Sequence, residues 1–252
     1  MNNRTVYNYI ISRLSRGKLH MTLIDPAKMD AEKIGEIGEI AERAGSSAIM
    51  IGGSTHLSME LVDRSVLEIR KKTSLPVILF PTAAATLSKH ADALYYMSML
   101  NSTDIRYLTG EQRQAIPFIR QTGIEPISMG YIIVEPGMTV GKVGKASVVP
   151  RDNPELAVSY SLMAQYFGMS LVYLEAGSGA PEPVPRKMIR EVRDAIDIPL
   201  IVGGGIRTHE QARAISEAGA DIIVTGTVVE EADDVLQALA SIIEGINSRG
   251  MA

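Results

Sequence analysis

Residues Leu200 to Glu230 read LIVGGGIRTHEQARAISEAGADIIVTGTVVE, and this stretch decides the predicted fold. It contains two short apolar runs rich in β-branched residues, Leu200 to Val202 and Asp221 to Val224. Each run leads through a glycine-bearing loop into a segment with the apolar spacing of a helix. Because this alternation is typical of parallel strands joined by crossover helices, the stretch predicts two consecutive βα units.

The same alternation extends through the rest of the chain. Six earlier runs resemble these two: Leu19 to Ile24, Ala48 to Ile51, Val77 to Phe80, Ala93 to Met97, Ile127 to Val134 and Leu171 to Leu174. The total of eight strands is the number that closes a barrel, and 252 residues suit one such barrel. The prediction is an α/β protein with a (β/α)8 TIM barrel, a single domain over residues 1–252. The rival is an open doubly wound sheet, which would bind its ligand where the strand order reverses.

Helical spacing fills most of the connections between these runs. It predicts helices at Ala31 to Ala44, Met59 to Lys72, Asp104 to Gln121, Pro154 to Phe167, Arg186 to Ala195, His209 to Ala218 and Asp233 to Ile246. The third connection, Pro81 to Asp92, is short and irregular. Residues 1–17 carry apolar side chains at helical spacing with charges between them, unlike a signal peptide, and predict an extra amphipathic helix packed on the barrel.

Composition excludes several classes of function. The chain has no cysteine, which removes disulfides and thiolate metal sites and suits a reducing cytoplasm, where we expect it. A net charge of −4 does not favour binding of nucleic acid. No apolar stretch approaches the roughly 20 residues that span a bilayer, so we expect at most peripheral membrane contact. The four histidines lack the spacing of a zinc helix, and no G-x-S-x-G elbow indicates an acyl-transfer hydrolase.

The glycine-bearing loops after the last two predicted strands indicate a phosphate site. Glycines let the backbone approach an anion, and the free amides at a helix start point toward it. Barrels often build such a site from the loops after strands seven and eight. The candidates here are Gly204, Gly205, Gly226 and Thr227. Alternatively, three consecutive glycines only make a tight turn.

A third glycine-bearing loop follows strand six in the sequence LVYLEAGSGA, Leu171 to Ala180. It adds Tyr173, Glu175, Ser178 and Gly179 to the same end of the barrel. A carboxylate would repel a phosphate, so Glu175 fits better beside a neutral hydroxyl that must lose its proton, as a general base. The alternative is a glutamate that faces outward into solvent.

The first two strands end in residues that suit a magnesium ion. Asp25 follows strand one in MTLIDPAK, and Gly52, Gly53, Ser54 and Thr55 follow strand two. Magnesium takes few protein ligands and completes its shell with substrate phosphates and water. Asp-Pro after a strand is equally a good turn or cap pair.

Taken together, LIDPAK, IMIGGST, PVILFPT, YYMSMLNS, GYIIVEPGMTVGKVG, YLEAGSGA, VGGGIRT and ADIIVTGT resemble the geranylgeranylglyceryl phosphate synthase family. The resemblance extends from about Leu19 to Thr227. It implies a prenyltransferase that joins geranylgeranyl diphosphate to the 3-hydroxyl of sn-glycerol 1-phosphate and releases diphosphate, which forms the first ether bond of archaeal membrane lipids.

The resemblance also implies roles for individual residues. Asp25 and Ser54 match the magnesium positions of the family, and Glu175 would take the proton of the attacking hydroxyl. The glycerol phosphate contacts would be Tyr173, Leu174, Glu175, Ala176, Gly177, Ser178, Gly179, Gly204, Gly205, Gly226 and Thr227.

The prenyl tail needs an apolar channel, for which the sequence offers Tyr95, Tyr96, Met97, Met99 and Leu100, although a buried strand and its neighbours would look the same. Lys142 and Lys145 would either meet diphosphate or face solvent. The chain has no tryptophan, so any role that the family gives a tryptophan in limiting tail length or joining subunits must be filled differently.

Several alternatives remain open at this point. Within the family, the donor can be a longer heptaprenyl diphosphate. Outside it, the same loops would serve a sugar-phosphate isomerase, an indole-pathway barrel, or a barrel that only binds a phosphorylated metabolite. We expect a homo-oligomer, a dimer or a hexamer, since the outer helices carry apolar positions.

Overall fold

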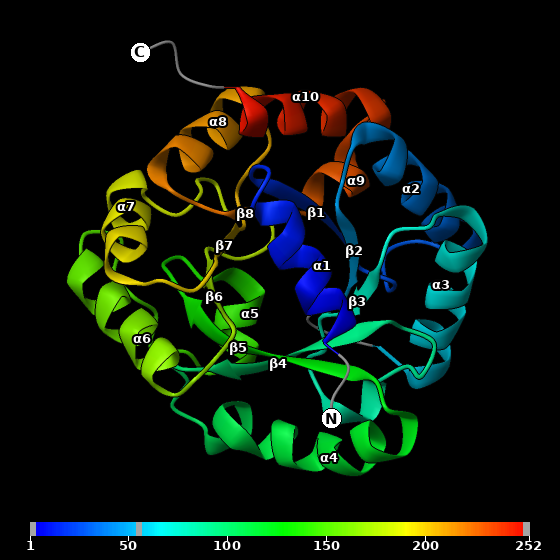
Figure 1. The fold of residues 1–252 in the computed structure, drawn as a ribbon, viewed down its shortest axis with the longest axis horizontal. Coiled ribbons are helices and arrows are strands. Elements are labelled where there is room, and N and C mark those ends of the chain that lie inside the picture. The colour runs from blue at the N-terminus through cyan, green and yellow to red at the C-terminus, as the bar shows by residue number, and fades with distance from the viewer. Residues whose placement is uncertain (1–3, 54–56, 249–252) are drawn as a thin grey trace.

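Eight parallel strands close into a barrel in the order of the chain (Figure 1). The structure is a computed structural model and describes residues 4–53 and 57–248. The strands are β1 (Leu19–Ile24), β2 (Ala48–Ile51), β3 (Val77–Leu79), β4 (Ala93–Met99), β5 (Glu125–Ile133), β6 (Leu171–Glu175), β7 (Leu200–Gly203) and β8 (Ile222–Thr225). Because β8 pairs with β1, no strand edge remains open, and the rival doubly wound sheet is wrong.

Helices surround the barrel and connect its strands. They are α1 (Thr5–Leu14), α2 (Ala31–Ala44), α3 (Met59–Lys72), α4 (Glu111–Thr122), α5 (Met138–Val143), α6 (Pro154–Tyr166), α7 (Arg186–Ala195), α8 (His209–Ala218), α9 (Thr227–Glu231) and α10 (Val235–Asn247). The irregular third connection is confirmed and contains one short 3-10 turn, η1 (Ala84–Thr86). None of the helices in the described ranges has the length and apolar character needed to cross a bilayer.

Every second side chain along each strand points into the barrel interior and fills it. On β4, Ala93, Tyr95 and Met99 belong to the interior cluster, whereas Leu94 belongs to the cluster between barrel and helices. Both faces of a parallel barrel strand are buried, which explains the near-continuous apolar runs in the sequence. On β6 the corresponding inward-facing positions are Leu171, Tyr173 and Glu175, of which Glu175 is the last residue of the strand.

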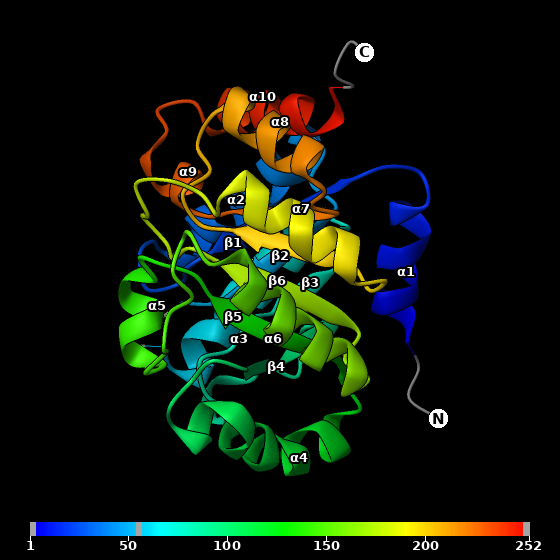
Figure 2. The ribbon, with the colours of Figure 1, turned by 90° about the vertical axis from the view of Figure 1, so that its left-hand side faces the viewer.

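Helix α1 covers the amino-terminal end of the barrel. Its Ile10 is fully buried in the interior cluster, and the amides of Val6 and Tyr7 donate hydrogen bonds of 2.7 and 2.9 Å to the carboxylate of Glu125 at the start of β5. A carboxylate is favoured at a helix N-terminus, so this contact holds the N-terminus of α1 against the start of β5. Figure 2 shows α1 at one end and α5 and α9 at the other, which leaves that second end for ligands.

Some predicted boundaries were wrong. Strand β6 continues to Glu175, so this residue ends a strand and does not lie in a loop. The helix predicted from Asp104 to Gln121 is divided into a π-helical turn, η2 (Arg106–Gly110), and α4. The short helices α5 and α9 were not predicted, because five or six residues give too little periodicity to recognise.

Candidate active site

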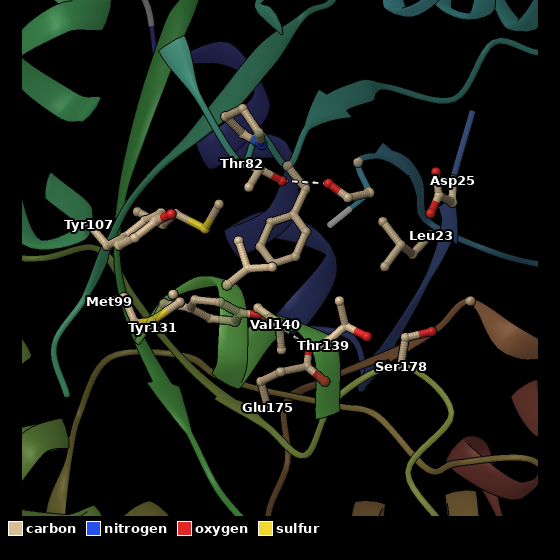
Figure 3. A pocket seen from close by; sticks show the side chains of 18 of the residues that line it. Leu23, Asp25, Thr82, Met99, Tyr107, Tyr131, Thr139, Val140, Glu175 and Ser178 are labelled. Carbon is tan, nitrogen blue, oxygen red and sulfur yellow. Dashed lines mark hydrogen bonds between the residues drawn. The ribbon is translucent and has the colours of Figure 1, made fainter. Parts of the chain in front are cut away.

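Two adjoining pockets lie at the carboxyl ends of the strands. The smaller is bordered by the loops after β6, β7 and β8, and the larger extends from there toward the loops after β3, β4 and β5. Leu23, Glu175, Ser178 and Gly226 border both. Figure 3 shows Asp25 and Ser178 on one side of the larger cavity and Met99 and Tyr107 on the other, so the cavity has a polar and an apolar side.

The smaller pocket brings together the glycine loops that the sequence singled out. Ser178 Oγ and Thr227 Oγ1 are 3.5 Å apart, which joins the loop after β6 to the start of α9. Gly204 and Gly205 have φ values of +83° and +73°, a left-handed conformation that favours glycine. Within the described residues, the amides of Gly205 and Thr227 donate to no protein acceptor. Free amides around a small pocket at a helix start suit a phosphate, so we call this the anion pocket.

Glu175 lies where the two pockets meet, with 5% of its surface exposed. Its Oε1 accepts a 2.6 Å hydrogen bond from the amide of Gly177, and its Oε2 accepts one of 3.3 Å from the Tyr131 hydroxyl. Burial raises the pKa of the carboxyl above its ordinary value, and these hydrogen bonds partly oppose the shift. A buried carboxylate with a raised pKa is equipped to accept a proton from a bound hydroxyl. The alternative of an outward-facing glutamate is wrong.

The buried carboxylate should also reduce stability at high pH. Because its folded-state pKa is raised, the folded protein holds this proton to a higher pH than the unfolded chain. Stability is therefore lost as pH rises from the unfolded pKa through the folded one. Glu175→Gln should raise the thermal unfolding midpoint more at pH 8 than at pH 4. Calorimetry at both values checks this, with Glu39→Gln on the exposed face of α2 as control. Equal changes at both pH values would contradict it.

Asp25 serves as a turn residue and also faces the larger cavity. Its Oδ1 accepts a 3.0 Å hydrogen bond from the amide of Ala27, as the turn interpretation predicts, and the residue borders the cavity. A Cβ on Gly53 would lie 2.3 Å from Oδ1, so glycine is required for the β2 loop to pass this carboxylate. Ser54 and Thr55 lie outside the described residues, and their predicted metal contacts remain predictions.

The described ranges contain no group of three or more His, Cys, Asp or Glu side chains that could hold a metal. A single carboxylate at the edge of a cavity does fit magnesium, which commonly takes one or two carboxylates and completes its shell with substrate phosphates and water.

The apolar side of the larger cavity includes only part of the predicted channel. Met97 and Met99 border the cavity. Tyr95 is fully buried deeper in the barrel, Tyr96 donates its hydroxyl proton to the Gln112 carbonyl behind β4, and Leu100 packs in the outer cluster. These three are corrections, because alternation directs Tyr96 and Leu100 away from the interior and places Tyr95 too deep. The cavity is also bordered by Phe80, Pro81, Tyr107, Val140 and Val143, and by Leu23 on the side of Asp25 (Figure 3).

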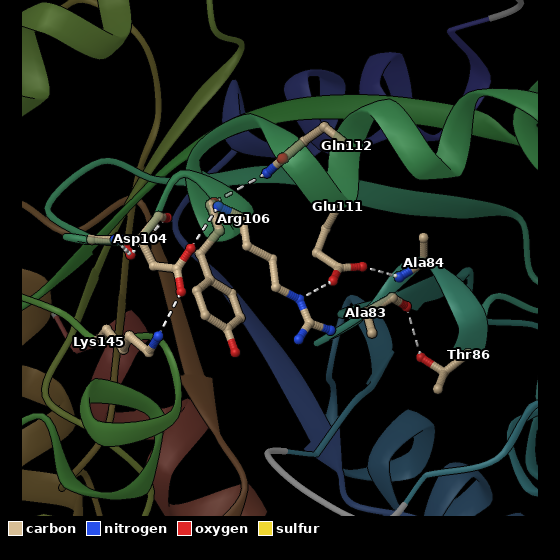
Figure 4. Close-up of polar contacts among 10 residues, drawn as sticks. Ala83, Ala84, Thr86, Asp104, Arg106, Glu111, Gln112 and Lys145 are labelled. Atoms are coloured by element: carbon tan, nitrogen blue, oxygen red, sulfur yellow. Dashed lines mark hydrogen bonds and ion pairs between the residues drawn. The ribbon is translucent and has the colours of Figure 1, made fainter.

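Polar contacts join the loops at the outer rim of this side (Figure 4). Lys145 Nζ lies 2.7 Å from Asp104 Oδ2, and Glu111 accepts hydrogen bonds from Arg106 Nε at 2.5 Å and from the amide of Ala84 at 2.8 Å. The loops after β3, β4 and β5 are thereby held together. Lys145 is engaged with Asp104, Lys142 is exposed, and neither residue is among those that border the cavity.

Comparison with known proteins agrees with this geometry. Residues 12–245 match the PcrB family. The chain belongs to that family. A geranylgeranylglyceryl phosphate synthase from Picrophilus torridus is 52% identical over 242 residues, which covers 96% of this chain and 100% of the relative. The corresponding synthase from Thermococcus gammatolerans is 52% identical over 243 residues, 96% of each chain.

A solved structure of another relative matches this PcrB protein closely. It is (S)-3-O-geranylgeranylglyceryl phosphate synthase from Thermoplasma acidophilum in complex with substrate sn-glycerol-1-phosphate. The TM-score is 0.94 at 47% identity, with 96% of this chain and 98% of that chain covered. The family resemblance seen in the sequence motifs is thus confirmed.

Besides several apolar residues that border the larger cavity, sequence reasoning missed two polar residues at the site. Tyr131 reaches Glu175 from the neighbouring strand, and Arg207 borders the anion pocket while its guanidinium donates a 2.7 Å hydrogen bond to the carbonyl of Ala180. Arg207 stands inside the quoted GGGIRT motif, so the signal was present. Tyr131 also stands inside a quoted motif, GYIIVEPGMTVGKVG, but its contact with Glu175 depends on strand register, which that motif does not show.

Proposed function

We propose that this protein joins a geranylgeranyl group to the 3-hydroxyl of sn-glycerol 1-phosphate and releases diphosphate. The observation that carries the proposal is the position of Glu175, a buried carboxylate between a glycine-lined anion pocket and a cavity with an apolar side. Glycerol phosphate in the anion pocket would place its free hydroxyl near this carboxylate. Relatives about half identical over nearly the whole chain carry the same activity in their names, which supports it.

In the proposed reaction, one group of the site accepts the proton that is released, and another helps to neutralise the negative charge on the leaving diphosphate. The hydroxyl oxygen bonds to the terminal carbon of the prenyl chain, and the bond from that carbon to diphosphate breaks. The electron pair of the broken bond leaves with diphosphate, and the hydroxyl proton passes to Glu175. A magnesium ion held by Asp25, with Ser54 as its second predicted ligand, would neutralise charge on the diphosphate when bound. Met97 and Met99 would contact the prenyl tail.

A product assay tests this proposal. Purified protein incubated with glycerol 1-phosphate, geranylgeranyl diphosphate and magnesium should release diphosphate and form an acid-stable ether lipid, detected by mass spectrometry. Chelation of magnesium should abolish both products. Absence of the ether with both substrates present would overturn the proposal. Competition between geranylgeranyl and heptaprenyl diphosphate in the same assay distinguishes the two chain lengths.

We also propose that the protein is a homo-oligomer. Exposed apolar side chains on the outer helices support this, with Tyr166 at 78% exposure and Phe167 at 69% at the end of α6. Light scattering measures the subunit number directly, and a monomer at micromolar concentration would contradict it.

A further inference from the structure

The carboxylate of Glu175 accepts one hydrogen bond on each of its oxygens. Oε1 accepts a hydrogen bond from the amide of Gly177 in the loop that follows β6, and Oε2 accepts one from the Tyr131 hydroxyl on β5. An ionised carboxylate has about four acceptor positions on its two oxygens. These two donors take one position on each oxygen, and Glu175 borders the larger cavity, where a substrate hydroxyl would lie.

Strand register explains why a β5 residue reaches this carboxylate. Tyr131 pairs with Tyr173 across β5 and β6, and Ile133 pairs with Glu175. Tyr131 thus stands one interior position below Glu175 on the adjacent strand, and a tyrosine is long enough to extend its hydroxyl up to the next layer. In Figure 3 the Tyr131 side chain points toward Glu175.

The Tyr131 ring is fixed by aromatic neighbours. Phe80 meets it edge to face with ring centroids 5.4 Å apart, and Tyr173 does so at 5.3 Å. Only 2% of Tyr131 is exposed. Burial raises the pKa of its phenol well above the ordinary value, which favours the neutral hydroxyl that can donate a hydrogen bond.

We propose that Tyr131 is a positioning residue for the reaction, whose hydroxyl holds Oε2 of Glu175 so that the carboxylate stays ionised and directed at the cavity. The proposal rests on the proposed function, in which Glu175 is the proton acceptor. Gly203 on β7 leaves room for the neighbouring Tyr173 hydroxyl, because a Cβ there would lie 2.1 Å from it.

Other ionisable groups surround the site and must be considered in any pH dependence. Tyr95 on β4 lies below, with its hydroxyl 3.2 Å from Met21 Sδ and not on Glu175. The remaining charged groups that border the two pockets are Asp25, Lys28, Glu111, Glu230 and Arg207. Lys28 and Glu230 form an ion pair of 2.6 Å with each other.

The test is the pH dependence of kcat/KM for glycerol phosphate in wild type and Tyr131→Phe. Activity of an enzyme with a carboxylate base falls at low pH as that base is protonated. Phenylalanine keeps the ring packing and removes one donor to the ionised form, so the acid limb should move to higher pH by about one unit. Tyr95→Phe, which removes a hydroxyl from the same aromatic cluster, should keep the wild-type limb. An unmoved limb in Tyr131→Phe, or an equal shift in Tyr95→Phe, overturns the proposal.

Two further measurements separate failure of this inference from failure of the proposed function. Replacement of Tyr131 by 3-fluorotyrosine makes a stronger donor of the same shape and should move the acid limb to lower pH. The infrared band of the Glu175 carboxylic acid can be identified as the one that Glu175→Gln removes. Its titration requires no turnover. This band should titrate at higher pH in Tyr131→Phe than in wild type. A wild type that makes no ether product refutes the proposed function, whereas an unchanged infrared titration refutes the role of Tyr131.

Discussion

Glu175→Gln should lower turnover by roughly 10²–10⁴-fold, the range of a single general acid–base group. The amide has nearly the same shape, and it keeps an oxygen that can accept the hydrogen bond from Gly177. It cannot accept the proton of the attacking hydroxyl. Steady-state kinetics with saturating prenyl donor measure the loss, and calorimetric titration of glycerol phosphate should give a dissociation constant within a few-fold of wild type.

The matched control is Glu39→Gln, which changes the same side chain on the exposed face of α2. It should leave turnover unaffected. Near-normal turnover in Glu175→Gln would exclude Glu175 as the proton acceptor, even if the protein proved to be a prenyltransferase.

Gly204→Ala should reduce kcat/KM for glycerol phosphate by about 10²-fold, the scale of a displacement near 1 Å in a site. An added Cβ would lie 2.6 Å from both Glu175 Oε1 and the Gly177 nitrogen, and the residue has a φ of +83°. The loops after β6 and β7 must therefore move apart, which separates the amides of the anion pocket and displaces the carboxylate. The same kinetic assay and the same titration detect this, and both should worsen.

Gly123→Ala is the control for backbone strain alone. Its φ is +71°, and an added Cβ there would meet nothing within 4 Å. It should cost about 1 kcal/mol of stability without changing affinity for glycerol phosphate. If Gly204→Ala also bound glycerol phosphate normally, the anion pocket would not be the phosphate site.

The fold was predictable because its signals are local. Apolar runs, glycine turns and helical spacing lie within short windows, and each of the eight predicted strands is present in the closed barrel. The direction of each side chain was not predictable, because both faces of a barrel strand are apolar. This is why Tyr95 looked like channel surface although it is fully buried beneath the site.

For the candidate site, the sequence predicted the glycine loops and Glu175, which lies at the end of β6 beside one of them. The glycine motifs predicted the anion pocket, and Glu175 was identified because it stands next to one of them. The contact of Tyr131 with Glu175 depends on pairing between residues 44 positions apart, which no local pattern encodes. Likewise, the glycine at position 53 gave no sign that it allows the β2 loop to pass Asp25.

A crystal structure with glycerol 1-phosphate bound would test the proposed site most directly. We predict the phosphate within hydrogen-bonding distance of the Gly205 and Thr227 amides, and the free terminal hydroxyl beside the Glu175 carboxylate. A phosphate bound outside the loops after β6, β7 and β8, or a hydroxyl directed away from Glu175, would contradict it.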